Sequence, residues 1–371
     1  MKRLLHFLVL LTLVLTSCAT SVDVYYMQPS EIDMGMARNI AIASAVPYSG
    51  RLGGYEFIRF SNFSDNTWYF RSSSSDMYLR DRVANYATRE FENTLYSTGY
   101  FNILDREVTD SILAAGRAGF NTNSMFKEKG VDAVIIPRIL GMSVDEFIYR
   151  IDTTKTVLDP KTNTNVVMKE PKFYLSQIVS IDFEYSIIST KTEQLVATRR
   201  FSKTIYNEDV QIKYHSTYSS TFDLYSMFTT ALDSFQSSIM KQLVPLGRRA
   251  NITLMANKPK DESIQDAYEL VKKGNVQSAK TLFLEHYNKT GFIPSGYNSA
   301  LLSAATGDFD TAIDELKQMV TKTNDSEVLT LLERLQRIKK NNERAQSQIK
   351  GESAGFSVDG SVNIYNQVMG Y

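Results

Sequence analysis

The sequence predicts an α+β protein in which a mixed α/β sandwich domain with long antiparallel hairpins is followed by an all-α helical-repeat domain. Three observations lead to this fold class. Apolar strands alternate with amphipathic helices in the first part of the chain, strand-type alternation fills the middle, and a helical pattern recurs in the last third. We place the first domain at residues 31–250 and the helical domain at residues 255–340.

The chain begins like an export signal. Lys2 and Arg3 are followed by a mostly apolar run from Leu4 to Leu15, and small residues precede Cys18. A basic start, an apolar run of about a dozen residues and a small-residue cut site are typical of a secretory signal peptide. The run is shorter than the roughly 20 residues that a membrane-spanning helix needs. We therefore predict that residues 1–17 are a signal peptide.

The end of this signal, with Leu15 three residues before Cys18, resembles the lipoprotein signal of bacteria. The resemblance implies that Cys18 is the lipidation site, where acyl chains such as palmitate are attached, and we treat residues 18–30 as a tether. Ala19 rather than Asp follows the cysteine, which by the sorting rule of some bacteria implies the outer membrane, with the protein facing the periplasm or the surface. An ordinary export signal with an incidental thiol is the alternative.

The composition narrows the classes of function. Lys plus Arg equals Asp plus Glu at 41 each, so no basic excess favours nucleic acid as a partner. Cys18 is the only cysteine, so the chain can form no internal disulfide and its fold must depend on packing and hydrogen bonds. The 21 Tyr and 20 Phe are explained by the strand propensity of aromatic residues and by filling of the core. The alternative is an exposed aromatic surface that binds protein partners or glycan.

The first domain is predicted from a series of periodic segments. A buried strand is expected at residues 39–46, an aromatic hairpin at 55–71 and a helix from Asp76 to Leu95. The hairpin either projects as a contact surface or packs its aromatic rings on the body. Further elements are expected at residues 100–106 (strand), 108–116 (helix), 131–140, 173–187 and 195–205 (strands), and 221–244 (helix), with an exposed loop or hairpin tip at 152–170.

The order of these segments resembles a known α/β domain. The strand Ile40–Ala43, the helix end and strand from Leu95 to Arg106, and the strand Gly130–Ile139 carry the likeness. Such a domain occurs in the curli-secretion channel subunit, in lipoprotein activators of penicillin-binding proteins and in the amino-terminal domain of TolB. The resemblance implies an oligomeric channel subunit or an activator of cell-wall synthesis as alternative functions.

The helical third contains two similar segments. Gly274 and Gly307 each end a predicted first helix, and their surroundings agree in four columns. The columns are Ala267 with Ala300, Val276 with Phe309, Ala279 with Ala312, and Phe283 with Leu316. This pattern resembles tetratricopeptide repeats, whose unit has about 34 residues. Two helical hairpins that are similar by chance are the alternative. A helix at 326–340 is expected to cap the array, and residues 341–371 are expected to form a flexible tail.

The sequence contains no recognisable catalytic, metal-binding or cofactor-binding motif. His6 lies in the predicted signal, while His215 and His286 are isolated, so no catalytic group, metal site or cofactor is predicted. In the repeat class, the first helices line a concave face, and this resemblance implies Tyr268, Lys272 and Tyr297 as contacts for a partner. A hydrolase with an unrecognised site is the weakest alternative.

The sequence therefore predicts a non-enzymatic, membrane-anchored lipoprotein of the cell envelope that acts as a protein-binding adaptor or assembly factor. Its expected partners are the lipid bilayer, through acylated Cys18, and an unidentified envelope protein; a homo-oligomer is compatible with the alternative of a secretion channel.

Overall fold

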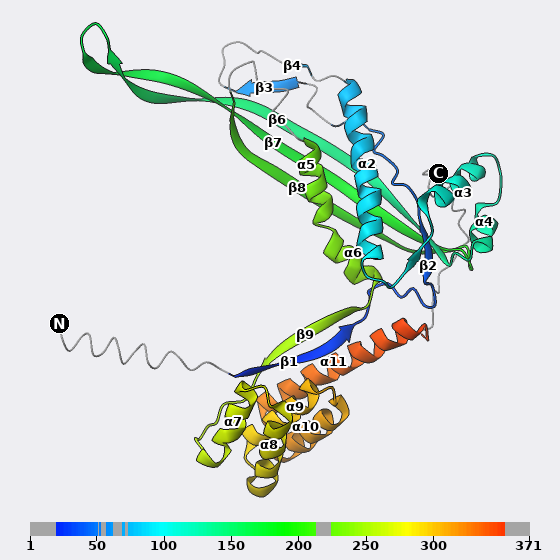
Figure 1. Ribbon diagram of the computed structural model, residues 1–371, viewed down its shortest axis with the longest axis vertical. Helices are drawn as coiled ribbons and strands as arrows, with labels where there is room; N and C mark the ends of the chain where they lie inside the picture. The colour runs from blue at the N-terminus through cyan, green and yellow to red at the C-terminus, as the bar shows by residue number, and fades with distance from the viewer. Residues whose placement is uncertain are drawn as a thin grey trace. The chain divides into compact units, whose positions relative to one another are not determined.

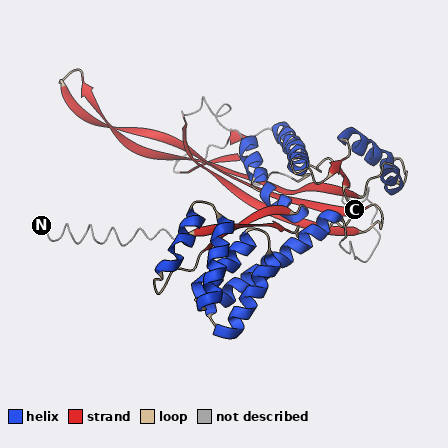
Figure 2. Cartoon of the chain, turned by 60° about the horizontal axis from the view of Figure 1, so that its bottom comes forward, coloured by secondary structure: helices blue, strands red, loops and turns tan. Residues whose placement is uncertain are grey.

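A computed structural model describes residues 20–50, 52, 57–61, 69–70, 73–212 and 224–352. The predicted signal peptide 1–17 and Cys18 lie outside the described residues, as do the turn of the aromatic hairpin at 62–68 and the last residues, 353–371. The chain divides into two compact units. The sheet unit contains Glu31–Val244, and the helical unit combines the described residues up to Ser30 with those from Pro245 onward. The predicted α+β fold class is confirmed (Figures 1 and 2).

The described residues of the sheet unit form a sheet of seven strands. Its central strand β6 pairs in parallel with β2 at one end and with β3 farther along, and it pairs antiparallel with β7 on its other edge. β7 pairs in turn with β8, β2 with β5, and β3 with β4. The strands are β2 (Asn39–Ile42), β3 (Phe57–Ser61), β4 (Tyr69–Phe70), β5 (Asn102–Ile103), β6 (Ala133–Asp159), β7 (Thr164–Ser189) and β8 (Leu195–Ile212).

Strand alternation explains why helices cover the sheet as they do. Every second residue of β7 from Val179 to Ile187 is buried and apolar, and the rings of Phe183 and Tyr185 contact Phe91 of α2. Helices α2 (Ser73–Tyr96), α5 (Leu224–Asp233) and α6 (Gln236–Leu243) therefore cover this face (Figure 1). On the opposite face, α3 (Arg106–Arg117) and α4 (Thr122–Glu128) cover a smaller apolar cluster that includes Val134, Ile136 and Ile188.

Two predicted elements of the sheet unit differ in the structure. The single helix predicted for 221–244 is interrupted between α5 and α6, where Phe235 N bonds to Leu232 O, three residues back rather than four, and the Phe235 ring packs against Phe183 and Phe201 of the sheet. The predicted strand 131–140 is the first part of β6, which continues to Asp159 through a register shift between Ile139 and Gly141. A Cβ at Gly141 would lie 2.8 Å from Asp182 Oδ2, so glycine permits this close approach.

The helical unit contains the predicted helical hairpins. Three of the four columns that repeat in the sequence are fully buried, namely Ala267 with Ala300, Ala279 with Ala312, and Phe283 with Leu316, whereas Val276 of the fourth column is only partly buried. Gly274 and Gly307 have φ values of +78° and +90°, a conformation that glycine adopts at no steric cost, and each follows its first helix. The helices are η1 (Glu262–Ile264), α7 (Gln265–Lys272), α8 (Val276–Thr290), α9 (Ile293–Ala305), α10 (Phe309–Thr323) and α11 (Ser326–Lys350).

A two-stranded ribbon completes this unit. β1 (Ser21–Gln28) pairs antiparallel with β9 (Leu246–Thr253) over their whole length. Val22, Val24 and Ile252 of the ribbon belong to the same buried cluster as the helices. The ribbon and α11 thus bury apolar surface that two repeat units alone would leave exposed.

Helix α11 extends beyond its predicted end. Residues 341–350, which we assigned to the flexible tail, are helical up to Lys350, and Gly351 ends the helix with φ +72°. The reason is tertiary. Ala345 is fully buried, the Gln348 side chain accepts from Ser30 N and donates to Ser30 O, and Asn342 Oδ1 accepts from Met27 N. The leading segment of the chain thus gives this polar helix a surface on which to pack.

Candidate functional site

The most distinctive exposed feature of the sheet unit is the end of the β6–β7 hairpin, residues 151–172, which we call the arm. β3 pairs with β6 as far as Tyr149, and β8 pairs with β7 as far as Phe173. Beyond these positions, the described residues supply no third strand, and the arm extends past the neighbouring strands as a twisted ribbon (Figure 1). The predicted hairpin tip within 152–170 is therefore confirmed, and its strands join at a turn where Asn163 has φ 51°.

Apolar side chains are exposed on both faces of the arm. Residues that lie opposite each other in an antiparallel pair share a face, and neighbours along a strand lie on opposite faces. Val157 lies opposite Val166 on one face, whereas Val167 lies on the other. Exposure is substantial, at 65% for Val167 and 56% for Met168. The exposed apolar residues of the arm are Ile151, Val157, Leu158, Val166, Val167 and Met168.

Charges interrupt both faces of the arm. Lys155 lies opposite Met168 and on the same face as Glu170, while Lys169 lies on the other face opposite Thr154. Neither face is therefore a continuous apolar surface of the kind that lipid requires, and a charged side chain facing lipid costs about 2–4 kcal/mol for Lys near the bilayer midplane.

The predicted partner-binding residues occupy different environments. Tyr268 and Tyr297 are buried, at 8% and 9% exposure, and burial raises the pKa of the Tyr268 hydroxyl to about 12. Lys272 is exposed and forms an ion pair with Glu269 at 2.7 Å. Of the three residues, Lys272 alone presents its side chain to solvent. Contact of these residues with a partner stays a prediction.

The structure gives Tyr268 a role that the sequence did not indicate. Its hydroxyl donates to Met255 O at 2.8 Å and accepts from Asn298 Nδ2 at 2.9 Å. Asn298, fully buried in α9, also accepts from Met255 N and donates to Met255 O. Asn298 thus completes the backbone hydrogen bonding just after β9 ends. A lone Asn within the small and apolar residues of α9 is the sequence signal that could have identified this site.

A Ser-His-Asp arrangement lies nearby, and sequence reasoning missed it because its members are far apart in the chain. His286 Nδ1 lies 2.9 Å from Ser295 Oγ, and His286 Nε2 lies 3.1 Å from Asp261 Oδ2. A nucleophilic serine must reach its substrate, yet Ser295 is fully buried. This group therefore links the loop before α7 to α8 and α9, and its geometry does not support hydrolysis.

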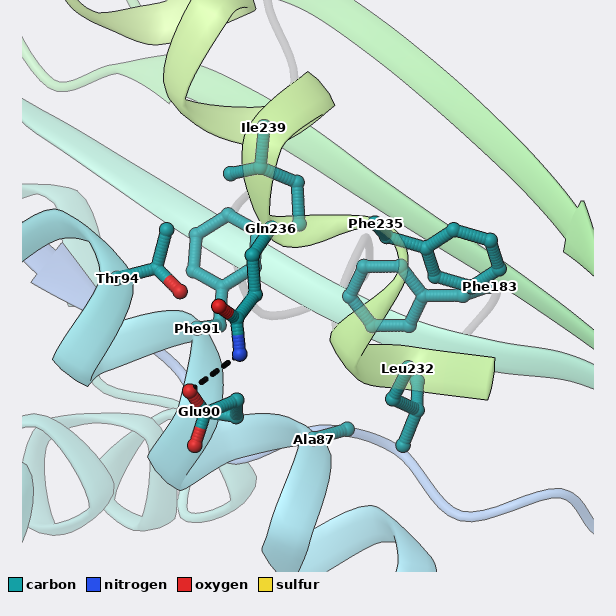
Figure 3. A pocket seen from close by; sticks show the side chains of 9 residues that line it. All are labelled: Ala87, Glu90, Phe91, Thr94, Phe183, Leu232, Phe235, Gln236 and Ile239. Atoms are coloured by element: carbon teal, nitrogen blue, oxygen red, sulfur yellow. Dashed lines mark hydrogen bonds between the residues drawn. The ribbon is translucent and has the colours of Figure 1, made fainter. Parts of the chain in front are cut away.

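The cavity beneath α2 and α6 is equally unsuited to a substrate. Figure 3 shows its lining, in which Gln236 Nε2 donates to Glu90 Oε1 at 2.6 Å beside the rings of Phe91 and Phe235. It encloses about 10 Å³, the room of a single water molecule at most. Within the described part of the chain, no group of three or more His, Cys, Asp or Glu residues could hold a metal ion. None of the described helices combines the length and the apolar character that crossing a membrane requires.

Comparison with known proteins gives weak likenesses only. No family model and no curated protein matches the sequence. A PelC dodecamer from Paraburkholderia phytofirmans is 10% identical and matches 58% of this chain and 97% of its own, with a TM-score of 0.24. A lipoprotein from Neisseria meningitidis is 7% identical, with 54% and 97% covered and a TM-score of 0.24. A protein from Xanthomonas campestris is 10% identical, with 58% and 87% covered and a TM-score of 0.23. At these identities and TM-scores, the likenesses support no conclusion about the fold or the function of this chain.

Proposed function

We propose that this protein is a lipid-anchored lipoprotein of the cell envelope that acts as a non-enzymatic protein-binding adaptor or assembly factor, with the arm as its binding element. The observation that carries the proposal is the exposure of apolar side chains on a ribbon that lacks a third strand among the described residues. A two-stranded hairpin is marginally stable in water unless further strands or a helix cover it. A partner would supply that cover.

Burial energies and charge pairing favour a protein as the molecule that covers the arm. Burying an aliphatic side chain completely contributes about 1.5–3 kcal/mol, so covering Val167 and Met168 would offset part of the entropy that association costs. A protein partner can also pair with Lys155 and Glu170, which a lipid chain cannot. No strand pairs with the outer edges of the arm among the described residues, which leaves room for strand addition, in which main-chain hydrogen bonds add to side-chain contacts.

The anchor completes the proposal. Acylation of Cys18 would hold the protein at a membrane, for which we propose the outer membrane, and would raise the effective concentration of nearby envelope partners. The helical unit, with its resemblance to tetratricopeptide repeats, offers a second surface, on which we retain Tyr268, Lys272 and Tyr297 as proposed contacts.

An oligomeric secretion channel is the second candidate. β8 pairs with β7 on one edge, and its outer edge has no strand partner among the described residues, so a second copy could add to it. The charges on both faces of the arm count against a lipid-facing wall. Detergent-stable rings and ion conductance would favour this candidate. Activation of cell-wall synthesis is a specific form of the adaptor function, and a hydrolase remains the weakest alternative.

Photo-crosslinking tests the role of the arm. A benzoylphenylalanine at Val167 or at Met168 samples its two faces, and the same residue at Tyr206 on β8, 68% exposed, is the matched control. We expect a discrete adduct with another envelope protein from the arm positions and not from Tyr206. Adducts at all three positions alike, or none from the arm in intact cells, would refute the proposal, and a dimer of this chain alone would favour the channel.

A further inference from the structure

Thr20, the first described residue of the helical unit, lies close in sequence to the proposed acylation site. Leu254 N donates to Thr20 O at 2.8 Å, which extends the pairing of β1 with β9 by one step toward the amino terminus. Ala19 alone separates Thr20 from Cys18. Two residues span at most about 7 Å when fully extended, so an acyl chain on Cys18 would begin within that distance of the ribbon.

Hydrogen bonds fix this end of the ribbon to the helices. Met255, the next residue after Leu254, is held by Asn298 of α9 and by the Tyr268 hydroxyl of α7. The following loop closes on itself, because Asn257 Oδ1 accepts from Asp261 N and Asn257 Nδ2 donates to Asp261 O. The Asp261 carboxylate then contacts His286 of α8. We call residues 255–262 the basal loop. It cannot move away from Thr20 without breaking these contacts.

We propose that the basal loop lies against the headgroup layer of the bilayer, so that the acyl anchor orients the helical unit as well as retaining it. The inference rests on the acylation of Cys18 in the proposed function. It follows from the short chain between Cys18 and Thr20 and from the rigid connection between Thr20 and the loop.

The side chains of the loop suit a phosphate-bearing surface. Ala256, Lys258, Pro259 and Lys260 are exposed, and none of them is a large apolar residue that would insert into the acyl region. The acidic residues of the loop have partners: Asp261 contacts Ser263 and His286, and Glu262 forms an ion pair with Lys260 at 2.5 Å. Lys258 is thus exposed to the anionic phosphates of the headgroups.

Fluorescence quenching in vesicles tests this orientation. The acylated full-length chain, with bimane on Lys258→Cys, is reconstituted in phosphatidylethanolamine and phosphatidylglycerol vesicles that contain a lipid with a headgroup nitroxide. Because Cys18 is the only native cysteine, the introduced thiol is the only free one in acylated protein. The matched control is Lys273→Cys, an exposed lysine at the opposite end of α7, which is about 12 Å long.

We expect severalfold stronger quenching at Lys258→Cys than at Lys273→Cys. Equal quenching at both positions, or none at Lys258→Cys in protein that floats with the vesicles, would overturn the orientation and leave the anchor intact. Vesicle flotation of Cys18→Ser tests the anchor separately: unchanged flotation of this variant would refute the proposed function itself.

A longer tether gives a second test that requires no change to the loop. Inserting about twelve Gly and Ser residues after Ala19 adds a flexible segment with an end-to-end distance of roughly 20 Å. Flotation should persist and quenching at Lys258→Cys should fall toward that at Lys273→Cys. Undiminished quenching with the long tether would refute the short connection as its cause.

Discussion

Helix α9 and the arm both depart from the usual distribution of side chains, α9 because it buries polar residues and the arm because it exposes apolar ones. α9 holds polar residues in a fully buried position, among them Ser295, Asn298 and Ser299, whereas the arm exposes Val167 and Met168. These two departures are the informative ones, because exposed polar and buried apolar residues need no explanation. In α9, Ser295 and Asn298 have hydrogen-bond partners within the chain, whereas Ser299 Oγ and Ser303 Oγ have none among the described residues. For the apolar groups of the arm, the described residues provide no cover.

The difference indicates that the polar groups of α9 stabilise the fold of the helical unit, whereas the apolar groups of the arm are available for binding. Asn298 makes two hydrogen bonds with Met255, just after β9, and a third with the Tyr268 hydroxyl, and Ser295 contacts His286. These groups stabilise one arrangement of ribbon and helices. The arm contributes little to that arrangement, so its exposed side chains should matter for binding and hardly at all for folding. Variants in the two regions should therefore separate stability from partner capture.

The largest expected effect is that of Asn298→Ala. The change leaves Met255 N without its acceptor and opens a small cavity in α9, so we expect the free energy of unfolding to fall by about 2 kcal/mol. Urea unfolding followed by far-ultraviolet circular dichroism measures it. A loss no greater than that of Ser299→Ala, the adjacent and equally buried position, would contradict this account.

Glu315→Gln should stabilise the helical unit in a pH-dependent way. Burial raises the pKa of the Glu315 carboxyl above its ordinary value of 4.5, while Lys280 opposes the shift, and Oε2 has no hydrogen-bond partner among the described residues. The folded chain thus binds this proton more tightly than the unfolded chain. Protonated Glu315 therefore stabilises the folded chain at pH values below the pKa that this carboxyl has in the unfolded chain. The contribution is lost as pH rises through the pKa of the carboxyl in the folded chain.

The variant should therefore melt at a higher temperature than the parent at about pH 7, and this gain should shrink at about pH 4. Thermal unfolding at the two pH values checks the sign. A gain that is equal at both, or larger in acid, would show that the carboxyl is not destabilised by ionisation.

The arm variant Val157→Thr with Val166→Thr should change stability by less than about 0.5 kcal/mol, as exposed positions usually do. The two residues face each other across the ribbon, and threonine keeps the branched shape that strands favour. Crosslinking from a probe at Met168, on the same face, should be lost. Unchanged crosslinking would show that this surface does not bind the partner, and unfolding of the chain would show that the arm contributes to folding.

Ser299→Ala is expected to cause no loss of stability. Ser299 Oγ is buried and has no hydrogen-bond partner among the described residues, so removing it abolishes a desolvation cost without breaking a contact. Stability should stay the same or rise slightly, by less than about 1 kcal/mol. A clear loss would mean that the hydroxyl is bonded after all.

Local periodicity was sufficient to predict many of the elements. The alternation in β7, the apolar spacing in α2 and the small residues that recur around Gly274 and Gly307 each depend on neighbours in the chain, and the structure confirms them. The break between α5 and α6, where Phe235 packs on a distant strand, was not predicted. The candidate site was found in part: the tip at 152–170 was expected, but its extension past β3 and β8 depends on pairing lengths.

The sequence by itself determined the fold class, since the fold class depends on local composition and short-range periodicity; the export signal at the start of the chain stays a prediction. Only the tertiary structure shows that residues 21–28 pair with β9 and that α11 extends to Lys350. It also shows that Asn298 holds Met255, just after the end of β9. These contacts join residues that are tens to hundreds of positions apart. Their hydrogen-bond and packing energies depend on geometry that no local pattern encodes.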